Sequence, residues 1–127
     1  MDSQNESSSG PESLARAGHA LLTILVAEDP FINSFVRTLL QREGYKVVTT
    51  DHFRGGDLVR TGGVQADVVV TNKPEYFLPF SENRPLLYIA ANPDPELALR
   101  FQKCRVLRKP FRYEDFLEAI EALTLAV

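Results

Sequence analysis

The feature that most constrains the fold is a regular alternation of short apolar segments with segments of helical pattern. Residues 21–27, LLTILVA, are almost continuously apolar, which is typical of a strand covered on both faces of a sheet. Four more strands are predicted along the chain, at residues 45–50, 67–71, 85–91 and 104–108. Because strands that alternate with helices favour a parallel sheet with helices on both sides, we predict a three-layer, doubly wound α/β fold.

Three of the intervening segments have a helical pattern. Asp29 and Pro30 suit the N-cap and the first turn of a helix that ends at Gly44. Its apolar stripe is Phe31, Ile32, Phe35, Val36, Leu39 and Leu40. A second helix is expected to begin within residues 92–95 and to turn Leu97, Ala98 and Phe101 inward. The last helix follows Phe111, and its core side is Phe116, Leu117, Ile120 and Leu123.

Two connections are less regular. Residues 51–63 are expected to form a weak helix at best, because Gly55 and Gly56 each cost about 1 kcal/mol relative to alanine. Residues 73–84, KPEYFLPFSENR, hold two prolines and no helical period. We therefore expect the third helix of the fold, the one between the third and fourth strands, to be shortened or missing.

Composition indicates one domain with a tail in front of it. Residues 1–20 carry few large apolar groups, so we expect a flexible tail there and a domain over residues 21–127. The net charge of −3 creates no field that would draw the chain to nucleic acid or to an anionic membrane. No apolar run approaches the roughly 20 residues of a membrane span, and the first residues lack a secretion signal. With one cysteine, Cys104, the chain fits a reducing compartment, and we expect it in the cytoplasm.

Polar residues follow several of the predicted strands at their carboxyl ends. Glu28 and Asp29 follow the first strand, Asn72 the third and Lys109 the fifth, while Ala90 closes the fourth. Sites in open α/β sheets form outside these ends. We expect the five residues to lie at one edge.

An acidic pair, a central residue and a lysine at this edge resemble the site of response-regulator receiver domains. The resemblance covers residues 22–125, and its marks are ILVAED, ADVVVTN and LRKPF, in that order. It implies a flavodoxin-like sheet of five parallel strands in the order 2-1-3-4-5. It also implies a cis peptide at Lys109-Pro110.

Receivers accept a phosphoryl group on an aspartate, and the resemblance carries over residue by residue. Glu28 and Asp29 match the pair that holds Mg²⁺, and Lys109 matches the lysine that contacts the phosphoryl group. Asn72 stands in the acceptor position and Ala90 stands where a serine or threonine would be. An acyl phosphate needs a carboxylate nucleophile, which an amide does not supply. We therefore predict a degenerate site that does no phosphotransfer and binds Mg²⁺ weakly, in a protein that is no enzyme and has no cofactor.

Simpler roles compete for two of these residues. Asp29 is also a helix cap, and Glu28 with Lys109 would form a structural ion pair that holds the site in one state.

Two surface features are candidates for binding a protein partner. The first is the aromatic segment with Tyr76, Phe77 and Phe80, whose rings alternatively fill the space of the lost helix. The second is a basic run without an acidic residue: Arg100, Lys103, Arg105, Arg108, Lys109 and Arg112. An acidic protein or a second copy of the chain would fit the run. Nucleic acid fits less well, because no aromatic stacking platform accompanies the cations.

These features favour a pseudo-receiver, a protein-interaction module in two-component-type signalling that works without phosphorylation. One alternative is an active receiver with an atypical acceptor. Another is a flavodoxin-like binder of a small ligand. The lack of a glycine-rich loop after the first strand argues against it.

Overall fold

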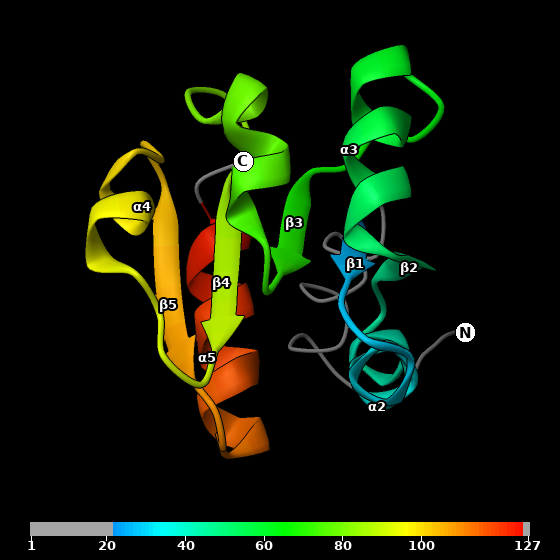
Figure 1. The fold of residues 1–127 in the computed structure, drawn as a ribbon. Helices are drawn as coiled ribbons and strands as arrows, with labels where there is room; N and C mark the ends of the chain where they lie inside the picture. The colour runs from blue at the N-terminus through cyan, green and yellow to red at the C-terminus, as the bar shows by residue number, and fades with distance from the viewer. Residues whose placement is uncertain (1–21, 126–127) are drawn as a thin grey trace.

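The computed structural model describes residues 22–125, which build one parallel sheet with helices on both faces (Figure 1). The strands are β1 (Thr23–Ala27), β2 (Lys46–Thr50), β3 (Val68–Thr71), β4 (Leu86–Ala90) and β5 (Cys104–Arg108). Their order is β2-β1-β3-β4-β5, and every neighbouring pair is parallel. The predicted sheet and its order are confirmed. The tail expected at residues 1–20 lies outside the described residues.

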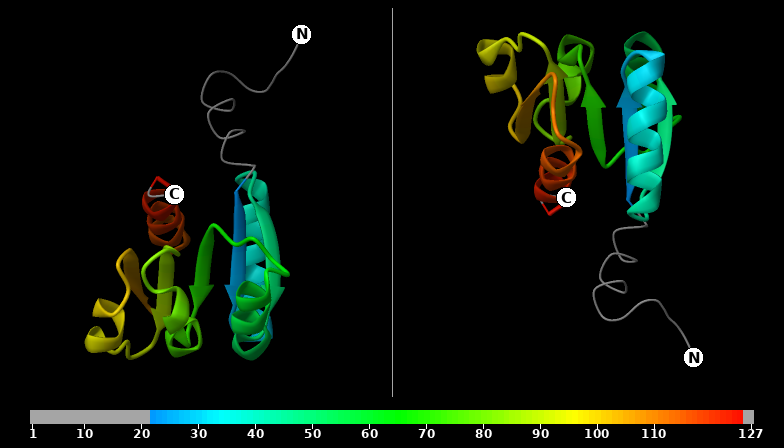
Figure 2. Two further views of the ribbon diagram at one scale, coloured as in Figure 1. Left: turned by 90° about the horizontal axis from the view of Figure 1, so that it is seen from above. Right: turned by 90° about the horizontal axis from the view of Figure 1, so that it is seen from below.

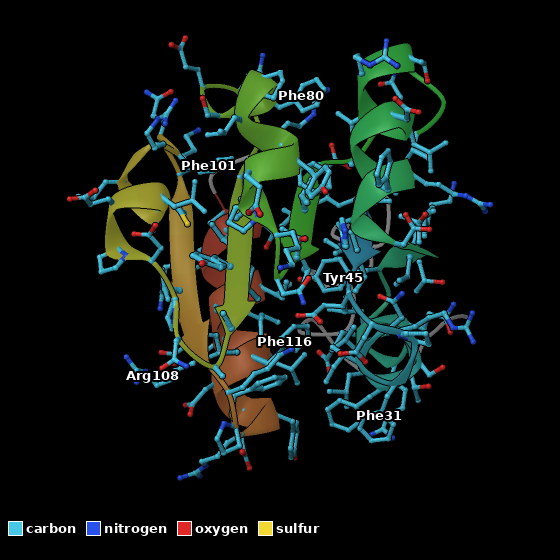
Figure 3. The ribbon with its side chains drawn as sticks, in the orientation of Figure 1. Phe31, Tyr45, Phe80, Phe101, Arg108 and Phe116 are labelled. Atoms are coloured by element: carbon cyan, nitrogen blue, oxygen red, sulfur yellow. The ribbon has the colours of Figure 1, made fainter. Side chains whose placement is uncertain are left out.

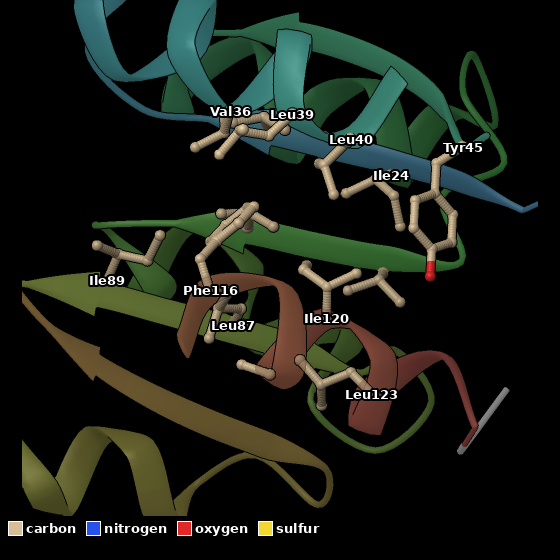
Figure 4. Close-up of a cluster of buried hydrophobic side chains, with 14 residues drawn as sticks. Ile24, Val36, Leu39, Leu40, Tyr45, Leu87, Ile89, Phe116, Ile120 and Leu123 are labelled. Carbon is tan, nitrogen blue, oxygen red and sulfur yellow. The ribbon is translucent and has the colours of Figure 1, made fainter. Parts of the chain in front are cut away.

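The helices divide between the two faces of the sheet (Figure 2). They are α2 (Pro30–Arg42), α3 (His52–Thr61), the 3-10 helix η1 (Pro74–Phe80), α4 (Pro95–Leu99) and α5 (Tyr113–Thr124). Side chains of α2 and α5 share one core cluster with the sheet, and α3, η1 and residues near α4 share the other. In the first cluster, Val36 and Leu40 of α2 and Phe116 and Ile120 of α5 close on β1, β3 and β4 (Figure 4). No helix of residues 22–125 is long and apolar enough to cross a membrane.

The helix that connects β3 and β4 is shortened, as predicted. Residues 74–80 form a 3-10 helix with Pro79 inside it, and α4 is also short, with five residues. Phe77 of η1 is 1% exposed and belongs to the second core cluster. The ring fills the layer in which a longer helix would otherwise lie.

The helix α3 is more regular than expected. Asp51 caps it by accepting a hydrogen bond from the Arg54 N–H at 2.8 Å, and Gly62 ends it in the left-handed conformation with φ 78°. A Cβ on Gly55 would lie 3.0 Å from Cζ of Phe77, and one on Gly56 would lie 2.8 Å from the carbonyl oxygen of Tyr76. The glycines therefore let α3 approach η1, and the segment forms a capped helix of ten residues.

The predicted apolar stripe of α2 is only partly buried. Val36, Leu39 and Leu40 are buried, but Phe31 is 78% exposed and Phe35 is 45% exposed. Figure 3 shows Phe31 on α2 at the outside of the molecule. Phe31 and Phe35 instead line a groove together with Pro110 and Phe111.

Candidate functional site

The strand register brings the predicted site residues to one edge. Ala27 of β1 pairs with Thr71 of β3, so Glu28 and Asn72 follow at adjacent positions. Ala90 ends β4, and its carbonyl accepts a hydrogen bond from the Lys109 N–H at 2.9 Å. The Lys109-Pro110 peptide bond is cis, as the resemblance implied.

Glu28 and Lys109 form an ion pair across the edge. The Lys109 Nζ lies 3.2 Å from Glu28 Oε1, and the Asp29 N–H donates to the same oxygen at 3.2 Å. The Glu28 side chain has no exposed surface, whereas that of Lys109 is 25% exposed. Burial raises the pKa of Glu28, and the attraction of Lys109 opposes this shift without cancelling it. The expected structural ion pair is therefore present, with its acid on the buried side.

Two oxygen atoms at this edge are buried without a hydrogen-bond donor. They are Oε2 of Glu28 and Oδ1 of Asn72. Next to Asn72, the Thr71 hydroxyl donates to the Ala27 carbonyl at 2.9 Å and accepts from the Lys73 N–H at 3.0 Å. The backbone that carries Asn72 is thus tied to β1.

Asn33 is a site residue that the sequence analysis missed. Its Oδ1 accepts from the Glu28 N–H at 3.1 Å, and its Nδ2 donates to the carbonyls of Glu28 and Thr50 at 3.0 Å each. The amide therefore fixes the end of β1 against the end of β2. The signal was an amide side chain one turn into a helix that starts at the site.

The residues present fit a Mg²⁺ ion poorly. Asp29 is exposed, and its Oδ1 caps α2 by accepting from the Ile32 N–H at 3.0 Å. Glu28 already faces an ammonium group, and Asn72 contributes no charge. Within residues 22–125, no group of three His, Cys, Asp or Glu side chains is placed to hold a metal ion. The edge offers a divalent cation fewer free carboxylate oxygens than such an ion prefers.

Asp67 does not reach the carboxyl edge. It lies before β3 at the other end of the strand, where its Oδ2 accepts from the Thr23 N–H at 2.8 Å. It is thus bound to the backbone at the amino edge of the sheet.

The structure changes the set of aromatic partner candidates. Phe77 was one of the candidates for partner contact, but its ring is buried beneath α3, in agreement with the alternative that it fills the space of the lost helix. Phe80 is partly buried against the same cluster. Tyr76 is exposed, and its ring centroid lies 4.6 Å from that of His52 and 5.6 Å from that of Phe53. Tyr76 is the member that remains open to a partner.

The basic run lies on and around the edge strand β5. We call this surface the basic β5 face, and its residues, all exposed, are Arg100, Lys103, Arg105, Arg108 and Arg112. Figure 3 marks Arg108 near the end of β5. Lys109 is separate, since it turns to Glu28. Two apolar side chains, Leu99 and Val106, are exposed among the cations.

A groove beside the carboxyl edge was not predicted. It has a volume of about 510 Å³ and lies between α2 and the start of the β5–α5 connection. We call it the Phe31 groove; its lining includes Phe31, Ile32, Phe35, Lys109, Pro110 and Phe111. Sequence periodicity places these rings on a helix face but does not tell whether another element covers that face.

Comparisons with known proteins agree with the fold. No family model matches the sequence, and no curated protein is detectably similar to it. The chemotaxis response regulator CheY4 of Vibrio cholerae is similar in structure, with a TM-score of 0.66 and 23% identity over 80% of this chain and 98% of that chain. A response regulator receiver domain protein from Clostridium thermocellum has a TM-score of 0.63 and 20% identity over 83% of this chain and 95% of that chain. The chain therefore has the flavodoxin-like fold of receiver domains.

Proposed function

We propose that this chain is a pseudo-receiver, a protein-interaction module of two-component-type signalling that works in the cytoplasm without being phosphorylated. The observation that carries the proposal is the end of β3, where Asn72 offers an amide beside the Glu28–Lys109 pair. The fold shared with CheY4 supports the signalling context.

The chemistry of the edge opposes phosphotransfer. An acyl phosphate forms when a carboxylate oxygen attacks phosphorus, and an amide oxygen is a far weaker nucleophile. Ala90 has no hydroxyl to contact a phosphoryl oxygen. Lys109 is already bound to a carboxylate that has no exposed surface. A phosphoryl group would thus find neither an acceptor nor a free cation among these residues.

Two other functions have less support. An active receiver with another acceptor would need a carboxylate near Asn72, but Asp67 lies at the opposite end of β3. A small-ligand binder of the nucleotide type would need a phosphate-binding loop after β1, where the acidic Glu28 and Asp29 stand instead.

The basic β5 face is the surface that best suits a protein partner. Its cations are exposed, and two apolar side chains, Leu99 and Val106, accompany them. Such a face fits an acidic protein surface or the acidic side of a second copy. Tyr76 provides a second, aromatic contact point on another part of the molecule.

An amide NMR titration tests whether the carboxyl edge still responds to phosphorylation. Mg²⁺ is added first, and then beryllofluoride, which mimics a phosphoryl group. The signals of Asn72 and of the residues around Lys109 are expected to stay in place through millimolar additions. Shifts that begin at Glu28 and Asn72 and spread into α5 would overturn the proposal.

The Asn72→Asp variant is the matched comparison. The added carboxylate beside Glu28 restores a ligand for a hard cation, so Mg²⁺ should now shift signals at the carboxyl edge. Beryllofluoride should still leave α5 unmoved, because Ala90 offers no hydroxyl. A full response of the single variant would show that the alanine does not disable the switch.

A further inference from the structure

A second polar site lies at the amino edge of the sheet, opposite Glu28 and Asn72. The connections before β3, β4 and β5 meet there and form a pocket of about 240 Å³. Its polar lining consists of Gln65, Asp67, Asn83, Arg84 and Lys103. The pocket therefore holds two cations, one carboxylate and two amides.

Arg84 is the residue that points to a ligand. Its Nε is shielded from solvent and has no hydrogen-bond acceptor. Within the described part of the chain, its guanidinium makes one hydrogen bond, from Nη1 to the Asn83 carbonyl at 3.3 Å. A buried N–H without an acceptor costs about 1–3 kcal/mol. A small rotation of the side chain toward a bound acceptor would remove that cost.

The charge of Arg84 is not neutralised by the carboxylate that shares the pocket. No ion pair joins Arg84 to an acid within residues 22–125. Asp67 Oδ2 is bound to the Thr23 N–H at 2.8 Å.

The shape of the guanidinium narrows the class of ligand. Its parallel N–H groups match two oxygens of a carboxylate or phosphate, whereas a lysine acts as a point charge. The pocket volume leaves room for such an oxyanion with several waters, since one water occupies about 30 Å³.

We propose that this amino-edge pocket binds a small oxyanion, a phosphate or carboxylate group, through the guanidinium of Arg84. The site is separate from the carboxyl edge and does not depend on the proposed function.

Amide NMR titrations of the full chain with sodium phosphate, sodium acetate and sodium chloride at equal ionic strength test the proposal. Phosphate should shift the signals of Gln65, Asn83 and Arg84 in a saturable way, with a dissociation constant on the order of millimolar. Saturation by phosphate alone assigns a tetrahedral ligand, and saturation by acetate as well assigns a carboxylate such as an acidic side chain. Non-saturating shifts equal to those in chloride would overturn the proposal.

Three variants place the binding on Arg84. Arg84→Gln should abolish saturation, and Arg84→Lys, which keeps the charge without the fork, should weaken binding by about fivefold or more. Arg54→Gln, which removes an exposed arginine on α3, should bind as the natural chain does. Unchanged saturation in both Arg84 variants would refute the assignment, and the dispersion of each spectrum reports whether the variant is folded.

Discussion

Glu28 is a carboxylate with no exposed side-chain surface, and its one cationic partner is itself partly exposed. Removing one member of a buried ion pair typically costs about 3–5 kcal/mol, because the other charge is left unpaired in a medium of low polarity. Burial shifts the pKa of Glu28 upward in spite of Lys109. At the scale of single residues, the site therefore favours the protonated form of Glu28 more than water does.

The Glu28→Gln variant should change the pH dependence of stability. An acid whose pKa is higher in the folded state than in the unfolded state stabilises the fold below the unfolded pKa, and this contribution is lost as pH rises through the folded pKa. The natural chain should therefore lose stability relative to the variant as pH rises from about 4.5, the unfolded value. Urea unfolding of both proteins between about pH 4 and pH 7.5 measures the difference.

The sign of that trend is the decisive result. If the natural chain instead gains on the variant with rising pH, Lys109 lowers the pKa of Glu28 more than burial raises it. The Asp29→Asn variant is a suitable control, since asparagine keeps the helix cap and the residue is exposed.

The helix α3 and the 3-10 helix η1 form one unit at the next scale. The carbonyl of Tyr76 approaches the position that a Cβ on Gly56 would take to 2.8 Å. Phe77 packs from the same turn into the core. The close approach of the α3 and η1 backbones thus compensates for the short length of η1.

Replacing Gly56 by alanine should destabilise the fold although alanine is the better helix former. The gain in propensity is about 1 kcal/mol, but the new methyl group meets a backbone carbonyl, and such overpacking costs about 1–3 kcal/mol. Gly63→Ala is the control, because its Cβ meets the flexible end of Leu58 at 3.2 Å. Thermal unfolding should show a lower midpoint for Gly56→Ala than for Gly63→Ala, and equal midpoints would contradict the packing argument.

Phe77 and Tyr76 should respond differently to truncation. Phe77→Ala removes a buried ring and should cost about 3–5 kcal/mol. Tyr76→Ala removes a ring from a residue that is 38% exposed and should cost about 1 kcal/mol or less, mainly through its contacts with His52 and Phe53. Urea unfolding compares the two, and a loss of only about 1 kcal/mol or less for Phe77→Ala would restore Phe77 as a candidate for partner contact.

Contacts between one element and another are the features that the sequence does not predict. The strands and the shortened helix between β3 and β4 were predicted, because apolar runs and proline positions act locally, whereas the strand order was implied by the resemblance to receiver domains. The packing role of Gly55 and Gly56 was missed, because their helix penalty is intrinsic, whereas their contact with η1 depends on the tertiary structure. The exposure of Phe31 was missed for the same reason, since periodicity does not reveal which neighbour covers a side chain. At the site, the ion pair followed from strand order, but the clamp by Asn33 needed the backbone geometry.

The whole molecule segregates its charges. The chain has a net charge of −3, yet the basic β5 face has five exposed cations. One pocket between the end of α2 and α5 is acidic, with Glu43, Glu114, Glu118 and Glu121 in its lining. The two surfaces meet at Glu114, which lies 3.5 Å from Arg112 of the basic β5 face. Local fields of opposite sign steer encounters more strongly than the small net charge suggests.

This segregation should be visible in ion-exchange chromatography. The natural chain should be retained on a cation exchanger at pH 7.5 and low salt in spite of its net negative charge. The Arg105→Glu/Arg108→Glu variant should pass through, whereas Arg37→Glu/Arg54→Glu, with the same net charge, should still be retained. Loss of retention in both variants would show that net charge, rather than the basic β5 face, controls binding.

The ion pair between Glu28 and Lys109 has a consequence for how the activity of such a module would be regulated. A ligand shifts a conformational equilibrium only by its difference in affinity for the two states. With the lysine bound to Glu28 and no acceptor beside it, the carboxyl edge offers a phosphoryl donor no such difference. Under the proposed function, occupancy of the partner is then set by mass action. The cell would read the abundance of this chain, through its synthesis and degradation, instead of a chemical mark placed on it.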